Sequence, residues 1–298
     1  SPLLRAWLRR LADLGVALHT RHRWIGWDEA GALRIVKPTG VETSVAPDVT
    51  IFALGGASWP RLGPDGGWVS PLRAAGVAVT PLEAANAGVE VAWSDIFRQR
   101  FEGQPIKRLA VTCEGETALG EAMVTRTGLE GGAIYAIGRQ VRDQIARKGS
   151  ARILIDVRPS FSVEELANKL AQPRNKQSTA NFLRKVAGMA PIAISLAREG
   201  ARGPLPNDAP ALAALIKAIP LTVTGMSGLA RAISTAGGVR FDVLDEGLMI
   251  KAMPGAFVVG EMLDWEAPTG GYLLQATFAT AVRAAEGAQT WLDRDQTK

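Results

Sequence analysis

The sequence predicts a mixed α/β protein, and three observations support this fold class. An apolar run at 49–54 ends in a cluster of glycines. A second apolar run, at 256–259, also ends in glycine and is followed by a glycine-opened helix. Between these two segments, short alternating strand patterns give way to amphipathic helices. The two glycine segments therefore flank a middle region of different character.

The N-terminal part begins with a helix over Pro2–Leu14. Its apolar residues fall on one face at helical spacing: Leu4, Trp7, Leu8 and Leu11. We expect strands at 16–20, 23–27 and 32–36, the last one after a turn at 29–31.

The run Val49–Leu54 is too short for a membrane span and suits a buried strand. It leads into Gly55-Gly56-Ala57, and further glycines follow at 63, 66 and 67. Glycines this close together let a backbone approach a ligand without interference from a Cβ atom. A tight turn between a strand and a loop is the alternative. A helix is predicted around Trp68–Ala75.

The segment 254–275 is the most informative part of the chain. A strand at Ala256–Val259 ends at Gly260-Glu261, and Gly270-Gly271 precedes a helix from Tyr272 to about Trp291. A carboxylate accepts hydrogen bonds from hydroxyls, and a helix offers free N–H groups at its positive end. This arrangement suits a polyol chain joined to a ring with a polarisable carbonyl edge. A strand–loop–helix with tightly packed glycines is equally compatible with these residues alone.

The middle region predicts short strands at 85–93, 105–115, 120–128 and 151–159. One helix is expected over Gly132–Arg147, with Ile134, Ile137, Val141 and Ile145 on one face. Four more are expected at 162–170, 178–187, 192–199 and 209–218, and Ser162 with Glu165 forms a capping-box pattern. The sequence STAGGV, from 234, predicts a glycine turn.

Together, ALGGASWPRLGPDGG and VVGEMLDWEAPTGGYLLQ resemble the bacterial FAD-dependent oxidoreductases often labelled aminoacetone-oxidase-like flavoproteins. These belong to the larger class of flavoproteins with two dinucleotide-binding domains, and the similarity covers nearly the whole chain. The resemblance implies a partial FAD/NAD(P)-binding Rossmann-like domain made of residues 1–83 and 233–298. Residues 84–232 would form an inserted small β-barrel with a helical lobe.

The resemblance also implies which residues contact the flavin. Glu261 stands where many relatives carry an Asp that binds the ribityl chain, and Gly270 and Gly271 would face the N1–C2 carbonyl edge. Three members of the expected set have a structural alternative to flavin contact. Trp24 could be a core tryptophan, Asp264 could cap a loop, and Gln275 could simply pack. The full expected set is Trp24, Ala53, Leu54, Gly55, Gly56, Ala57, Gly260, Glu261, Asp264, Gly270, Gly271, Tyr272, Leu273 and Gln275.

In the family, a loop of the insert approaches the reactive side of the flavin. Here that loop is 125–132, and Arg126, Glu130 and Tyr135 are the candidates for contact with a small-molecule substrate. Relatives often carry His and Ser where this chain has Arg126 and Glu130, which leaves the substrate open. A salt bridge within the loop is the alternative.

Relatives open with a strand, the pattern G-x-G-x-x-G and a helix that binds the pyrophosphate. The printed sequence has no such pattern. We therefore expect that the pyrophosphate-binding unit lies upstream, and that these 298 residues alone bind FAD weakly or not at all. The expected reaction is hydride transfer to flavin N5, with reoxidation by a nicotinamide or by oxygen. In the opposite direction, NAD(P)H is the candidate electron donor to the flavin.

Composition limits the other possibilities. Apolar residues make up 47% and charged residues 21%, and no apolar run reaches the length of a membrane span. The single cysteine, Cys113, excludes an internal disulfide and fits a core position and a cytoplasmic setting. The two histidines, His19 and His22, would point to opposite faces of a strand, which argues against a shared metal site. Ser58 lacks the G-x-S-x-G pattern of a hydrolase.

The formal charge of +5 leaves a second function open. A non-catalytic flavin-fold protein could bind a partner or RNA through its basic clusters, although no aromatic stacking pattern accompanies them. Steep salt dependence of RNA binding would favour this alternative. The sequence does not predict an oligomeric state.

Overall fold

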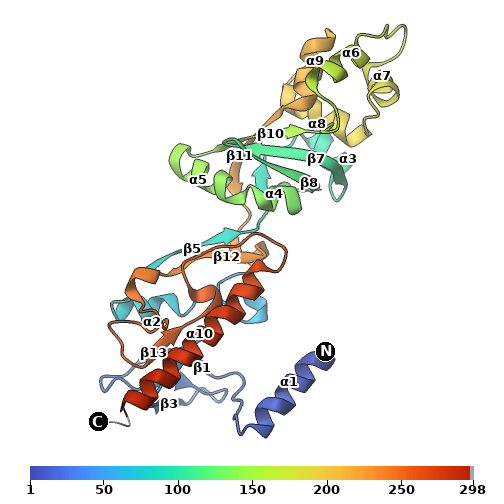
Figure 1. Ribbon diagram of the computed structural model, residues 1–298. Helices are drawn as coiled ribbons and strands as arrows, with labels where there is room; N and C mark the ends of the chain where they lie inside the picture. Colours follow the sequence, from blue (N-terminus) through green and yellow to red (C-terminus); the bar gives the residue numbers. More distant parts are fainter. Residues whose placement is uncertain (296–298) are drawn as a thin grey trace.

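The computed structural model describes residues 1–295 (Figure 1). The chain forms two bodies joined by a pair of strands. The first body contains both glycine segments, and the second is a barrel with helices, which we call the insert. The mixed α/β class with an inserted barrel is therefore confirmed.

The N-terminal helix α1 (Pro2–Asp13) is followed by an antiparallel sheet. Its strands are β1 (Arg23–Trp27), β2 (Leu33–Val36) and β3 (Glu42–Val45), and the last was not predicted from the sequence. The strand expected at 16–20 is wrong, because these residues form an irregular segment and a turn after α1. His19 and His22 therefore do not lie on opposite faces; their rings meet edge to face at 5.3 Å.

The centre of the first body is a parallel pair, β4 (Thr50–Phe52) and β13 (Ala256–Val258). The helix α10 (Tyr272–Asp295) runs across this body, and α2 (Val69–Ala74) lies near β1 (Figure 1). Short 3₁₀ turns complete the connections: η1 (Pro60–Leu62), η3 (Phe241–Val243) and η4 (Gly260–Met262). Buried Phe52, Phe257 and Leu72 belong to the core of this body.

The chain passes between the two bodies in β5 (Val79–Ala85) and β12 (Ser234–Val239), which pair antiparallel. The glycine turn expected at STAGGV is wrong, since these residues form β12. Gly237 and Gly238 sit at an irregularity of the pairing, and a Cβ on Gly237 would lie 2.0 Å from the carbonyl oxygen of Pro81. The glycines serve close backbone approach rather than a turn.

The insert contains a closed barrel of strand order β10-β11-β6-β9-β8-β7. Its strands are β6 (Val89–Val91), β7 (Pro105–Cys113), β8 (Glu116–Thr125), β9 (Gly128–Glu130), β10 (Ala151–Asp156) and β11 (Ile219–Met226). Inward side chains fill the barrel and form one core with the helices. Cys113 lies in this core as expected, and burial raises the pKa of its thiol.

The helix predicted over 132–147 is divided at Ile137 into α4 (Gly132–Ala136) and α5 (Gly138–Lys148). The backbone of Ile137 leaves the helical region while its side chain remains buried. The other helices of the insert are α3 (Asp95–Phe101), α6 (Val163–Leu170), α7 (Thr179–Val186), α8 (Pro191–Ala201) and α9 (Ala209–Lys217), with η2 (Leu229–Arg231) on the way back to the first body. The capping box of Ser162 and Glu165 is confirmed.

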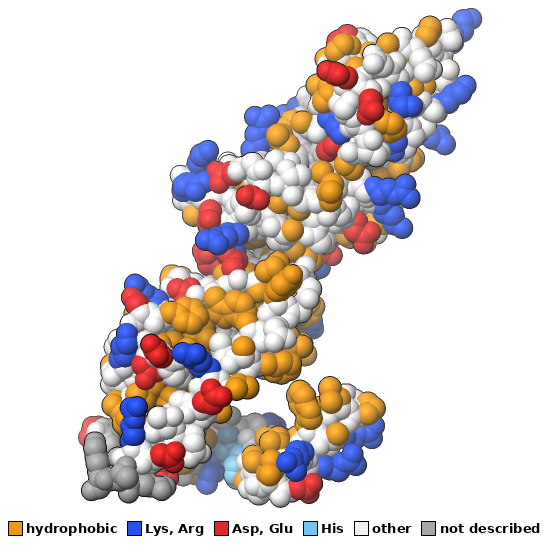
Figure 2. All heavy atoms as spheres, viewed as in Figure 1, with side chains coloured by type: hydrophobic (Ala, Val, Ile, Leu, Met, Phe, Trp, Pro, Cys, Tyr) orange, Lys and Arg blue, Asp and Glu red, His pale blue; other side chains and the backbone are white. Residues whose placement is uncertain are grey.

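Two apolar surfaces of the first body have no partner in the part of the chain that the structure describes. No residue of α1 is buried, and its apolar side chains face open space toward α10 (Figure 2). Trp7 is 53% exposed. On α10, on β4 and just after β4, the exposed apolar side chains are Tyr272, Leu274, Phe278, Val282, Ile51 and Leu54.

Candidate functional site

The candidate site is a groove where the two glycine segments meet. Because β4 and β13 are parallel, their carboxyl ends open at the same edge, the place where ligands bind in open α/β sheets. The groove has a volume of about 260 Å³. It is lined by Ala53, Gly55, Val259, Gly260, Glu261, Leu273, Leu274 and Thr277.

Glu261 fastens the two segments together. One oxygen of its carboxylate accepts a hydrogen bond from the N–H of Gly56 at 3.2 Å, and the other accepts from the N–H of Thr235 at 2.8 Å. A carboxylate has about four acceptor positions, so two contacts leave capacity for a ligand hydroxyl. Glu261 is thus both a structural joint and a groove residue.

Thr235 completes this joint. Its Oγ1 accepts a hydrogen bond from the N–H of Ala57 at 2.8 Å. A Cβ on Gly56 would lie 2.4 Å from Thr235 Oγ1 and 2.8 Å from Glu261 Cδ, so the backbone can come this close only as glycine. Thr235 escaped sequence analysis because STAGGV was interpreted as a turn.

Of the remaining residues of the first glycine segment, Gly55 lines the groove, whereas Leu54 and Ala57 lie outside its lining. Leu54 donates its N–H to the Sδ of Met262 at 3.1 Å, and its side chain is exposed. Gly55 has φ +74, and its carbonyl accepts a hydrogen bond from Trp68 Nε1 at 2.9 Å. Ala57 is buried.

The start of α10 forms the opposite wall. Gly270 and Gly271, just before this wall, have φ values of +113 and +94, a conformation that favours glycine. Both are exposed and lie outside the lining of the groove. Leu273 faces the groove, whereas Tyr272 and Gln275 are exposed outside its lining. One turn further along, Thr277 lies 3.2 Å from the position of a Cβ on Gly260. Helical periodicity from Leu273 could have identified Thr277.

Trp24 and Asp264 lie outside the groove. Trp24 packs against Trp27 and Phe52, with ring centroids at 4.9 and 4.7 Å. Its buried Nε1 has no hydrogen-bond partner among the described residues. Asp264 accepts a hydrogen bond from Thr80 Oγ1 at 2.6 Å and donates its N–H to Val239, so it anchors a loop to β5 and β12.

The three candidates from the insert lie outside the groove lining. Arg126 is exposed in the turn between β8 and β9. Glu130 approaches Arg231 of η2 at 3.6 Å. Burial and the nearby Glu130 carboxylate raise the pKa of Tyr135, so its hydroxyl is protonated at neutral pH. Arg231 was not predicted; η2 also contacts the first glycine segment, through a hydrogen bond from the N–H of Trp59 to Leu229.

The groove suits the ribityl chain and ring of a flavin cofactor better than its diphosphate. Its mostly apolar lining with two glycines, its one carboxylate and the first turn of α10 match a polyol and a ring edge. No Lys or Arg lines it, so a diphosphate would have no cationic partner there. Among the described residues, no cluster of side chains suitable for a metal ion and no helix able to cross a membrane is found.

The fold and the groove define a Rossmann-like α/β protein. The family model described as "HI0933-like protein Rossmann domain" matches residues 1–287. The chain belongs to this family, that of the aminoacetone-oxidase-like FAD flavoproteins, and the resemblance of the two glycine segments is confirmed.

Individual relatives are more distant. The chain is 24% identical over 253 residues to the 3-dehydro-bile acid delta(4,6)-reductase of Clostridium scindens, covering 81% of this chain and 62% of that protein. Among solved structures, the 3-ketosteroid delta1-dehydrogenase of Sterolibacterium denitrificans has a TM-score of 0.43 at 12% identity, covering 93% of this chain and 61% of the other. Quinol fumarate reductase of E. coli has a TM-score of 0.37 at 15% identity, covering 91% and 44%.

Proposed function

We propose that this chain is the part of an FAD-dependent oxidoreductase that holds the ribityl chain and the ring of the flavin. The observation that supports this most is the joint of Glu261 with Gly56 and Thr235. It brings two family-specific segments into one groove at the carboxyl ends of parallel strands. When bound there, FAD supplies a ring that accepts or donates a hydride.

Each wall of the groove has a role in this proposal. Glu261 accepts a hydrogen bond from a ribityl hydroxyl with a lone pair that the backbone does not use. Ala53 and Gly55 provide a surface without bulky side chains, against which the flavin lies. The N–H groups of Gly271 and Tyr272 face the pyrimidine edge. The positive end of α10 favours negative charge at that edge by about 0.3–1 kcal/mol.

We further propose that the pyrophosphate is held by a unit outside residues 1–298. Three facts support this proposal. No cation lines the groove. The chain spans 62% of the length of the 3-dehydro-bile acid delta(4,6)-reductase, one of its curated relatives. The apolar faces of α1 and α10 have no partner among the described residues. On this account residues 1–298 alone bind FAD weakly.

The insert contributes the substrate side. Arg126, Glu130 and Tyr135 would contact a small molecule that enters between the insert and the flavin, with Tyr135 as a protonated hydroxyl donor. The curated relative is named for a 3-dehydro-bile acid. A dehydro-bile acid is therefore the first substrate to assay, with a nicotinamide or oxygen as the electron partner.

The test compares two proteins: residues 1–298, and the same chain together with its upstream coding sequence. The longer protein should purify with bound flavin, visible as an absorbance band that bleaches when a reductant is added. The shorter protein should show little band and weak quenching of added FAD. A longer protein that is colourless and binds RNA with steep salt dependence would instead support the non-catalytic alternative.

A further inference from the structure

Three residues fix the loop that precedes α10, and one of them is held by a side chain of the insert. Loop 263–271 connects η4 to α10 and contains the Gly270-Gly271 pair. Asp264 is bonded to Val239 and Thr80, and the carbonyl of Ala267 accepts from Asn86 Nδ2 at 2.7 Å. Between these two points, Glu266 reaches the insert. From 268 to 270, no hydrogen bond fastens the loop to another element of the described chain.

Glu266 meets Arg142, which lies on α5 of the insert. All three nitrogens of its guanidinium are engaged outside α5. Nη2 donates to Glu266 at 2.7 Å, Nε lies 3.0 Å from Glu83, and Nη1 donates to the carbonyl of Ala84 at 3.2 Å. The side chain is 12% exposed, so these contacts are better shielded from water than a surface ion pair.

The surrounding charges make Arg142 difficult to replace. Glu83 and Glu266 come from different segments, β5 and loop 263–271, and both approach the same guanidinium. Arg139 also lies near Glu266, but at 3.7 Å, and it is 71% exposed. Loss of Arg142 would leave the carboxylates of Glu83 and Glu266 near each other without a close counter-charge. Arg139 would be a weak substitute, because it is solvated and lies farther from Glu266.

We propose that Arg142 is a positioning residue that couples the orientation of the insert to loop 263–271. The insert is joined to the first body by the strands β5 and β12, so a swing about this pair changes the place of α5. Because Arg142 contacts both Glu83 of β5 and Glu266 of the loop, the loop moves with the insert. The Gly270-Gly271 pair, three residues beyond Ala267, is thereby held beside the groove only in one orientation of the insert.

Only the consequence for ligand binding depends on the proposed function, since a flavin is what we place in the groove. The coupling itself is a property of the protein without any ligand. A ligand-free measurement can therefore fail while the flavin proposal stands, and the reverse also holds.

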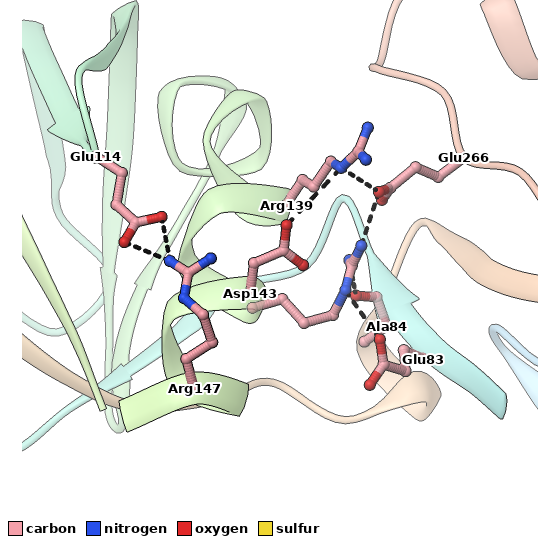
Figure 3. A network of polar contacts seen from close by, with 8 residues as sticks. Glu83, Ala84, Glu114, Arg139, Asp143, Arg147 and Glu266 are labelled. Atoms are coloured by element: carbon pink, nitrogen blue, oxygen red, sulfur yellow. Dashed lines mark hydrogen bonds and ion pairs between the residues drawn. The ribbon is translucent and has the colours of Figure 1, made fainter. Parts of the chain in front are cut away.

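The test is hydrogen exchange of the ligand-free protein. In Arg142→Leu, amides of 263–273 should exchange about tenfold faster than in the wild type, because the loop loses its grip on the insert. Amides of β10, in the barrel core, should be unchanged. Arg147→Leu is the matched control: it lies on α5 and loses its contact with Glu114 at 2.5 Å, but that contact stays inside the insert (Figure 3).

Two further variants separate coupling from general destabilisation. Glu266→Ala removes the acceptor from the loop while Arg142 keeps Glu83, so it should raise exchange at 263–273 even if Arg142→Leu does not fold. Arg142→Leu combined with Glu266→Ala should add little to either single change. With one dye on the insert and one on α10, the distribution of energy-transfer efficiencies should be broader in the variants than in the wild type. Wild-type loop exchange in Glu266→Ala, or equal acceleration in Arg147→Leu, would overturn the proposal.

Discussion

Glu261 and Gly56 are joined by a hydrogen bond of 3.2 Å although they stand 205 residues apart in the sequence. The entire insert lies between them along the chain. Each residue follows a strand of the parallel pair, and Glu261 also lines the groove.

Replacing Glu261 should weaken the first body. In Glu261→Ala, the N–H groups of Gly56 and Thr235 lose their acceptor, at a cost of about 1–3 kcal/mol in unfolding free energy. Urea unfolding measures this loss. Glu286→Ala, at an exposed position of α10, is the control and should change little. Equal stability of the two variants would contradict the role of the joint.

Gly56→Ala should be destabilising by about 1–3 kcal/mol, because the new methyl group meets Thr235 and the Glu261 carboxyl carbon. Gly132→Ala is the matched comparison, since a Cβ there meets nothing within 4 Å. It should be neutral or slightly stabilising. Thermal unfolding of both variants decides the point. A neutral Gly56→Ala would show that the two segments are not tightly packed.

The ion pair of Lys217 and Asp156 should contribute to the unfolding free energy of the insert. The two side chains are 14% and 16% exposed, their charged atoms are 2.6 Å apart, and Lys217 also donates to the carbonyls of Arg158 and Phe161. Lys217→Met leaves a carboxylate in a shielded place, at a cost of about 3 kcal/mol. Urea unfolding followed by exchange in β10 would measure it. A loss confined to the first body would contradict this assignment.

The raised pKa of Tyr135 makes the stability of the protein depend on pH in the alkaline range. Its pKa is raised above the ordinary value of 10.0, first by burial and then by Glu130. The neutral hydroxyl therefore contributes stability that is complete below that value and is lost as the pH rises through the higher, folded-state pKa. Glu130→Gln should lower the pKa of Tyr135. The chain has two tyrosines, so ultraviolet titration in a Tyr272→Phe background reports Tyr135 alone. An unchanged titration would mean that Glu130 does not act on it.

The sequence predicted the parts of the fold that depend on local patterns. The last four helices of the insert, the strands at 50–52 and 256–258, and the capping box of Ser162 all follow from periodicity or from side-chain chemistry close in the chain. The helix at 95–101 was not predicted. The false strand at 16–20 and the missed β12 have the opposite cause. Whether such a segment pairs depends on partners distant in sequence.

The candidate site was predictable to the same extent. Gly55 and Glu261 were identified because family motifs surround them, and the structure brings both into one groove. Thr235 and Arg142 carry no local signal. Their roles depend on contacts with segments up to 178 residues away, such as that between Thr235 and Ala57. Only the folded chain reveals such residues.

The most direct measurement of the central claim is the hydrogen-exchange footprint of FAD on the protein that includes its upstream coding sequence. The two segments 53–57 and 260–274 should become protected together when FAD is added, while β10 in the barrel stays unchanged. Protection of only one segment, or a footprint elsewhere in residues 1–295, would contradict the claim that these distant segments form one flavin-binding groove.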